Sequence, residues 1–92
     1  MADKIITVTL NPCLDRTVTV GEFRPYGLNR VLRSRTDPGG KGINVARVLR
    51  SFGAEVTATG FVAGGTGRAL AESLRKARID TDFLEIPGET RV

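Results

Sequence analysis

Residues 37–49 read Asp-Pro-Gly-Gly-Lys-Gly-Ile-Asn-Val-Ala-Arg-Val-Leu, and they carry the strongest local signal in the chain. A glycine-rich turn leads directly into a segment whose apolar residues recur at i, i+3, i+4 and i+7. These residues are Val45, Val48, Leu49 and Phe52. The pattern predicts a helix over residues 43–52, with this stripe as its apolar face, Arg47 and Arg50 off the stripe, and Gly53 as its end.

A second unit of the same kind follows. Residues 55–62 are mostly β-branched or small and predict a strand, and residues 64–67, Gly-Gly-Thr-Gly, predict a glycine loop. A second helix should then run to about Arg78, and residues 82–86 predict another strand. The residues expected on one face of this helix are Leu70, Leu74 and Ala77. Two successive strand–loop–helix units indicate an α/β fold, layered, with a largely parallel sheet.

The segment before the first helix does not fit that repeat. Residues 4–10 are β-branched almost throughout and predict a buried strand, which Asn11-Pro12 ends. Residues 16–20 and 29–35 alternate or mix with arginine, and a loop with Pro25 separates them. Because these two strands are too polar for a central sheet, we expect them to form a separate small sheet.

Composition excludes several classes of protein. The chain has 92 residues, of which 40% are hydrophobic and 26% are charged. These values are typical of one small globular domain and exclude a disordered tail, a collagen-like rod or a disulfide scaffold. No apolar run approaches the roughly 18–20 residues that span a bilayer, and the N-terminus lacks the apolar core of a signal peptide. We therefore expect a cytoplasmic protein that does not bind membranes.

Histidine is absent, which excludes several kinds of site. Ser-His-Asp and Cys-His catalysis are impossible without it, and one cysteine with carboxylates is a poor ligand set for zinc. We expect no metal site in these residues. Cys13 should fill a small pocket or line a loop, because no neighbouring base would activate its thiol.

Positive charge is concentrated in residues 16–50. That stretch has a net charge of +6, whereas the whole chain has +4. It could attract an anion, either a nucleic acid or a phosphorylated small molecule, or it could be a solvated arginine-rich face. Only Phe23 and Tyr26 supply aromatic rings there, and no nucleic-acid-binding motif is present, so we do not expect a nucleic-acid partner.

The glycine cluster before the first helix resembles three phosphate- or sugar-binding patterns. A P-loop fails because Arg35 stands where its first glycine belongs, and the dinucleotide-binding fingerprint lacks its third glycine. A glycine pair followed by Asn44 suits a sugar, since an amide can donate to and accept from hydroxyls. Asp15 is the natural companion, although it could equally be a turn residue, and the cluster a plain loop.

Four blocks taken together resemble one family. They are residues 9–15, 37–49, 60–67 and 88–91. Their order and spacing are similar to the N-terminal part of a ribokinase-like, PfkB-type sugar kinase, in the branch of 1-phosphofructokinases and tagatose-6-phosphate kinases. The resemblance covers the whole chain.

The resemblance implies a role for six residues. They are Asp15, Gly39, Gly40, Lys41, Asn44 and Arg91. Asp15 would hold sugar hydroxyls, and the glycine pair with Asn44 would bind the sugar. Lys41 would lie near the substrate phosphate, and Arg91 would clamp that phosphate.

The resemblance also implies an architecture and an activity. Residues 1–92 would be the N-terminal fragment of a kinase domain, with lid strands near 16–20, 29–35 and from 89, and with a homodimer formed through the lid. The catalytic base and most of the ATP and Mg²⁺ site lie further downstream in this family, so we expect no catalytic residue here. The substrate would be a ketose phosphate, fructose 1-phosphate first, then tagatose 6-phosphate and fructose 6-phosphate. The alternative is a non-catalytic fragment or anion-binding module.

Overall fold

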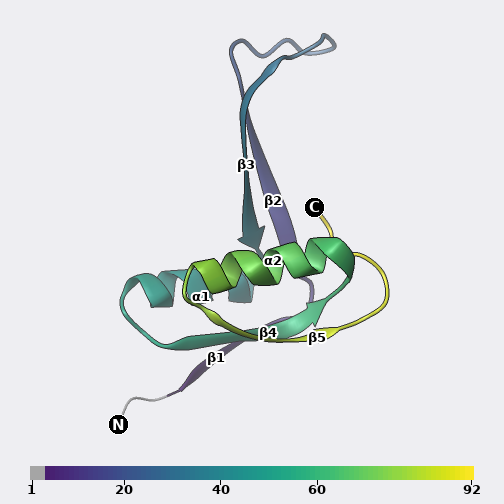
Figure 1. Cartoon of the computed structure of the whole chain (residues 1–92). Coiled ribbons are helices and arrows are strands. Elements are labelled where there is room, and N and C mark those ends of the chain that lie inside the picture. Colours follow the sequence, from purple (N-terminus) through teal and green to yellow (C-terminus); the bar gives the residue numbers. More distant parts are fainter. Residues whose placement is uncertain (1–3) are drawn as a thin grey trace.

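A computed structural model describes residues 4–92 (Figure 1). Its elements in chain order are β1 (Ile5–Thr9), β2 (Cys13–Val20), β3 (Val31–Gly39), α1 (Lys41–Ser51), β4 (Val56–Val62), α2 (Gly64–Lys76) and β5 (Asp80–Glu85). None of the helices in these residues is both long enough and apolar enough to cross a membrane.

The main sheet has three strands in the order β1-β4-β5, and all of them are parallel. The chain runs from β1 through β2, β3 and α1 to β4, and then through α2 to β5. Each crossover between parallel strands therefore contains one helix. Both helices lie on the same side of the sheet in Figure 1. The predicted α/β fold with a parallel sheet is confirmed.

Strands β2 and β3 form a separate two-stranded antiparallel sheet that projects from the layered part (Figure 1). The separate small sheet is as predicted, but its strands are longer than residues 16–20 and 29–35. The ladder continues down to the Cys13–Gly39 pair and includes Pro38. A proline fits there because both strands of a two-stranded sheet are edges, where an amide N–H is not needed on the outer side.

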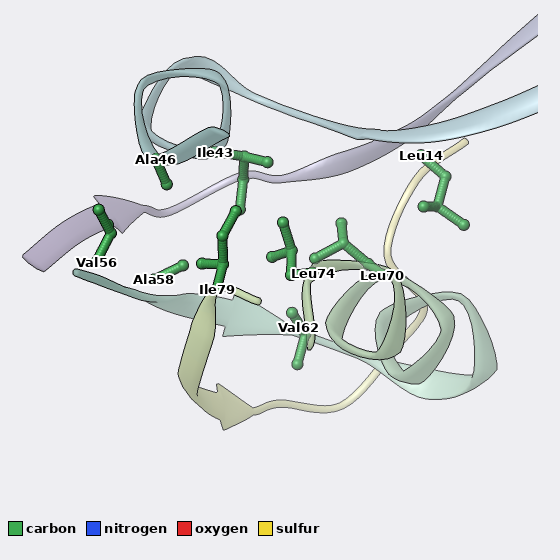
Figure 2. Close-up of a cluster of buried hydrophobic side chains, with 9 residues drawn as sticks. All are labelled: Leu14, Ile43, Ala46, Val56, Ala58, Val62, Leu70, Leu74 and Ile79. Carbon is green, nitrogen blue, oxygen red and sulfur yellow. The ribbon is translucent and has the colours of Figure 1, made fainter. Parts of the chain in front are cut away.

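The core lies between the main sheet and the two helices. Figure 2 shows its side chains, which are Leu14, Ile43, Ala46, Val56, Ala58, Val62, Leu70, Leu74 and Ile79. The opposite face of the sheet is open in this structure: Ile6 and Val8 are 57% and 59% exposed, while Thr7 and Thr9, which alternate with them, are buried. The prediction of a buried first strand therefore holds for one face only.

Helix α1 packs through a different face from the predicted one. Ile43 and Ala46 are fully buried, whereas Val45, Val48 and Phe52 are 51%, 54% and 82% exposed. Of the predicted stripe, Leu49 alone packs against the core, where it is partly buried. The helix carries two apolar rows, and helical periodicity alone does not say which row meets the sheet. The row with Ala46 lies against the core because a small residue lets the helix approach the strands closely.

Helix α2 begins earlier than predicted. Residues 64–67, expected to be a loop, form its first turn. Leu70 and Leu74 are fully buried as predicted, but Ala77 is exposed at the end of the helix, and the glycine and alanine of the same face, Gly67 and Ala71, are buried instead.

Candidate functional site

The base of the β2–β3 hairpin places Asp15 directly over a glycine. Cys13 pairs with Gly39 across the ladder, and Asp15 pairs with Asp37. Alternate residues of a strand share a face, so Cys13 and Asp15 point the same way. A Cβ atom on Gly39 would collide with the Asp15 carboxylate and would lie 3.2 Å from the Cys13 sulfur. Glycine at position 39 therefore makes the room in which this carboxylate lies.

Two carboxylates face each other at this base, which is unfavourable unless one of them is neutralised. The Arg35 guanidinium neutralises Asp37, with 2.8 Å between Nε and Oδ2. Asp15 has a weaker partner, because the Cys13 thiol donates to its Oδ1 at 3.3 Å. Within residues 4–92 no other hydrogen bond to the Asp15 carboxylate is present, so its remaining lone pairs are free to accept bonds from a ligand.

Cys13 is held in its neutral form. Burial, the hydrogen bond to Asp15 and the charge of that carboxylate raise the pKa of the Cys13 thiol, while the charge of Arg91 acts the other way. A protonated thiol can donate to Asp15 but is a poor nucleophile. This agrees with the prediction that Cys13 fills space and does not react.

Helix α1 begins beside this base with an uncapped N-terminus. Gly40 precedes the helix with φ of +120°, a conformation that residues with a side chain rarely adopt, and no side chain of residues 4–92 accepts a bond from the first helical N–H groups. The first turn contains no acidic residue, and Lys41 adds a positive charge. The Asn44 side chain is exposed one turn further on. Free N–H groups, the helix dipole and Lys41 together favour an anion or polar oxygen here.

Arg91 lies on the other side of β2 from β3. It forms a parallel bridge with Cys13, and its carbonyl oxygen accepts a hydrogen bond from the Leu14 N–H at 3.0 Å. Its guanidinium is exposed and makes one long hydrogen bond, 3.4 Å, to the carbonyl oxygen of Asn11. From residue 89 on, where we predict a further lid strand, the chain makes this single bridge.

The structure thus places the predicted site residues around the base of the hairpin, where β1 ends and α1 begins (Figure 1). Asp15 and Gly39 are in direct contact, and Arg91 adjoins them through Cys13. In the described part of the chain, the Lys41 and Asn44 side chains make no hydrogen bond to Asp15, and only their positions in the first turn after Gly40 bring them near it.

Two residues near the site were missed by sequence reasoning. Glu89 accepts a hydrogen bond from the Thr66 N–H at 2.6 Å, and the Thr90 hydroxyl accepts one from the Ala63 N–H at 2.9 Å. Both bonds cap α2, whose own N-cap residue, Ala63, has no side-chain acceptor. No local signal indicates them, because residues 64–67 resemble a loop in the sequence and both acceptors lie more than twenty positions further along the chain.

The cap gives Glu89 an unusual titration. The hydrogen bond from Thr66 lowers the pKa of the Glu89 carboxyl below its ordinary value of 4.5. Because the pKa is lowered on folding, the stabilisation is complete above the ordinary value and is lost as pH falls through the lower one. We expect the Glu89 carboxyl and the Thr66 amide to shift together in an NMR titration, with a midpoint below 4.5. A midpoint at or above that value contradicts the cap.

The site has no evident place for a metal ion. Within residues 4–92, no three His, Cys, Asp or Glu side chains lie together in an arrangement that could hold one. The neighbouring acidic pair at the hairpin base consists of two residues only, and one of them is already paired with Arg35.

Comparison with known proteins gives the site its context. Residues 8–92 match the model of the pfkB family of carbohydrate kinases. The chain is 42% identical over 87 residues to tagatose-6-phosphate kinase of Staphylococcus epidermidis, covering 95% of this chain and 28% of that protein. It is 46% identical over 88 residues to 1-phosphofructokinase of Bacillus subtilis, covering 96% and 29%. The chain therefore spans less than a third of the length of these relatives.

Solved structures agree with this. Phosphofructokinase-2 of Escherichia coli in complex with fructose-6-phosphate superposes with a TM-score of 0.89 at 34% identity, over 96% of this chain and 29% of that one. A tetrameric inhibited form of the same enzyme gives the same TM-score and the same identity over the same shares of the two chains. The sequence blocks, the parallel sheet with its separate hairpin and these matches lead to one conclusion: the chain belongs to the pfkB family of carbohydrate kinases.

Proposed function

We propose that this chain is the substrate-binding part of an ATP-dependent kinase that phosphorylates a ketose phosphate, fructose 1-phosphate before tagatose 6-phosphate or fructose 6-phosphate. One observation supports it above the others. A carboxylate with free acceptor sites, Asp15, lies over Gly39, and the backbone of Arg91, whose side chain is exposed, bridges Cys13 two residues before Asp15. Hydroxyls and a phosphate on one small molecule need these two kinds of group. The names of the two curated relatives support the same substrate class.

Each residue has a role that its surroundings allow. Asp15 accepts hydrogen bonds from adjacent sugar hydroxyls. Gly39 and Gly40 let the sugar approach the backbone, and the Asn44 amide donates to or accepts from a further hydroxyl. Arg91 binds two phosphate oxygens with its planar fork. Lys41 supplies a second positive charge near the phosphate, at the N-terminus of α1.

The hairpin serves as a lid in this proposal. Residues 1–92 form the N-terminal part of the kinase domain, and the strands near 16–20 and 29–35, with the chain from 89, cover the sugar. Val18 and Leu32 of the hairpin are 51% and 63% exposed, which favours a homodimer formed through the lids. A tetrameric form of the Escherichia coli relative is consistent with assembly in this family.

ATP and Mg²⁺ belong to the proposal but not to these residues. The described residues present no set of carboxylates suited to Mg²⁺. The contribution of this chain to catalysis is to bind the sugar and hold its phosphate. We propose a cytoplasmic location, because the substrate and ATP are both charged and do not cross a membrane unaided.

A coupled assay of ADP release tests this function. We expect the full-length kinase to release ADP with each of the three sugar phosphates, and kcat/KM to be highest for fructose 1-phosphate. Residues 1–92 alone should release none. Sugar-dependent ADP release by purified residues 1–92 would contradict the proposal that these residues bind the sugar but do not catalyse the transfer. Full-length protein that binds phosphate but is inactive with all three sugars would favour an anion-binding module.

A further inference from the structure

The segment between β5 and the end of the chain has no regular structure, yet it is fixed at several points. Thr90 is 8% exposed, and it bonds to Ala63 twice. Its N–H donates to the Ala63 carbonyl oxygen at 3.0 Å, and its hydroxyl accepts from the Ala63 N–H at 2.9 Å. Residue 90 is therefore attached to the start of α2.

Glu89 makes the second attachment. Its carboxylate accepts a hydrogen bond from the Thr66 N–H at 2.6 Å, in the first turn of α2. Gly64 has φ of +63°, and a Cβ atom there would collide with this carboxylate. The glycines at the start of α2 thus leave space for the side chain of a residue more than twenty positions away in the sequence. The positive end of the helix dipole favours a negative group at this place.

Arg91 depends on these attachments for its position. It follows directly after Glu89 and Thr90, and its backbone joins β2 through Leu14. Among residues 4–92, the one hydrogen bond of its side chain is the 3.4 Å bond to the carbonyl oxygen of Asn11. The position of the Arg91 guanidinium therefore depends on the backbone of residues 89–91. Capping α2 also occupies Glu89, which within residues 4–92 makes no ion pair with Arg91, two residues on.

We propose that Glu89 is a positioning residue for the substrate phosphate: by binding the N-terminus of α2, it fixes the backbone that presents Arg91 and leaves the Arg91 guanidinium free. This rests on the proposed function, in which Arg91 binds that phosphate. Glu89 itself touches neither the sugar nor the phosphate. Losing it should therefore weaken sugar phosphate binding only where Arg91 is present.

The test uses five variants of the full-length kinase: E89A, E89Q, E85A, R91A and the double variant E89A/R91A. In E89A we expect the KM for the sugar phosphate to rise about threefold to tenfold, the range expected from losing a helix cap. The kcat and the KM for ATP should stay within about twofold. E89Q keeps an oxygen that can accept from Thr66, so its KM should stay close to that of the wild type.

E85A is the matched control. Glu85 is also an exposed glutamate near α2, but it pairs with Arg68 at 3.4 Å and accepts no hydrogen bond from a helix N–H. Its replacement should leave the KM unchanged. In the R91A background, E89A should cause no further rise in KM, because the residue through which it acts is absent.

Two outcomes overturn the inference alone. One is an E89A enzyme with the KM of the wild type, and the other is an E89A effect that is equally large with and without Arg91. If R91A itself leaves the KM unchanged, the phosphate clamp of the proposed function is wrong, and the inference fails with it. Should E89A not fold, E89D replaces it under the same outcomes, since its carboxylate is one methylene short of Thr66.

Discussion

Replacing Asp15 with alanine in the full-length kinase should raise the KM for the sugar phosphate by about tenfold to a hundredfold. A hydrogen bond between a charged group and a hydroxyl contributes about 1.5–3 kcal/mol. Asp15 is in position to make such bonds, because its only partner in residues 4–92 is the Cys13 thiol. The measurement is a titration of sugar phosphate at saturating ATP. The KM for ATP should stay level.

Asp37 provides the matched control for Asp15. It is the cross-strand partner of Asp15, and its carboxylate is already paired with Arg35. D37A removes the same charge from the same end of the hairpin, but it removes no free acceptor, so its effect on KM should be much smaller. Unchanged KM and kcat in D15A, or equal effects of D15A and D37A, would show that Asp15 is a structural residue of the hairpin.

A substitution of Gly39, on the opposite strand, also tests whether Asp15 binds the sugar. A Cβ atom at this position would collide with the Asp15 carboxylate and approach Cys13. G39A should therefore move Asp15 and raise the KM for the sugar phosphate, while D15A and G39A combined should be less than additive. A fully additive pair would mean that the glycine acts on the sugar independently of Asp15.

Local patterns were enough to predict the elements of the fold. β-branched runs gave the parallel strands, and alternation with arginine gave the separate hairpin. The spacing of Leu70 and Leu74 gave the buried face of α2. These features are determined by residues a few positions apart in the chain, so the pattern of one sequence is enough to predict them.

The features that could not be predicted depend on tertiary contacts. In α1, the rows of Ala46 and of Val48 are both apolar, and only packing against the sheet selects the first. Residues 64–67 resemble a loop because glycine is a poor helix former. They become a helix turn because Glu89 and Thr90, far along the chain, satisfy its N–H groups. Likewise, the hydrogen bond from Cys13 to Asp15 depends on their common face on a strand that begins earlier than predicted.

Replacing Arg91 should separate a specific phosphate clamp from a general effect of positive charge. In R91A, the KM for the sugar phosphate should rise by at least about tenfold, as expected for the loss of a charge-assisted hydrogen bond to phosphate. R91K keeps the charge but loses the planar fork, so its KM should lie between those of R91A and the wild type. The KM for ATP should change little in either variant.

The control must be an arginine that does not touch the site. Arg47 does not qualify, because its guanidinium donates to the carbonyl oxygen of Pro38, next to Gly39, at 3.2 Å. Arg50 does, because it donates to Ala54 at the far end of α1. R50A should therefore leave the KM for the sugar phosphate unchanged. If R50A and R91A raise it equally, positive charge in general attracts the substrate and no clamp exists. If R91A matches the wild type, the Arg91 side chain has no part in binding the phosphate.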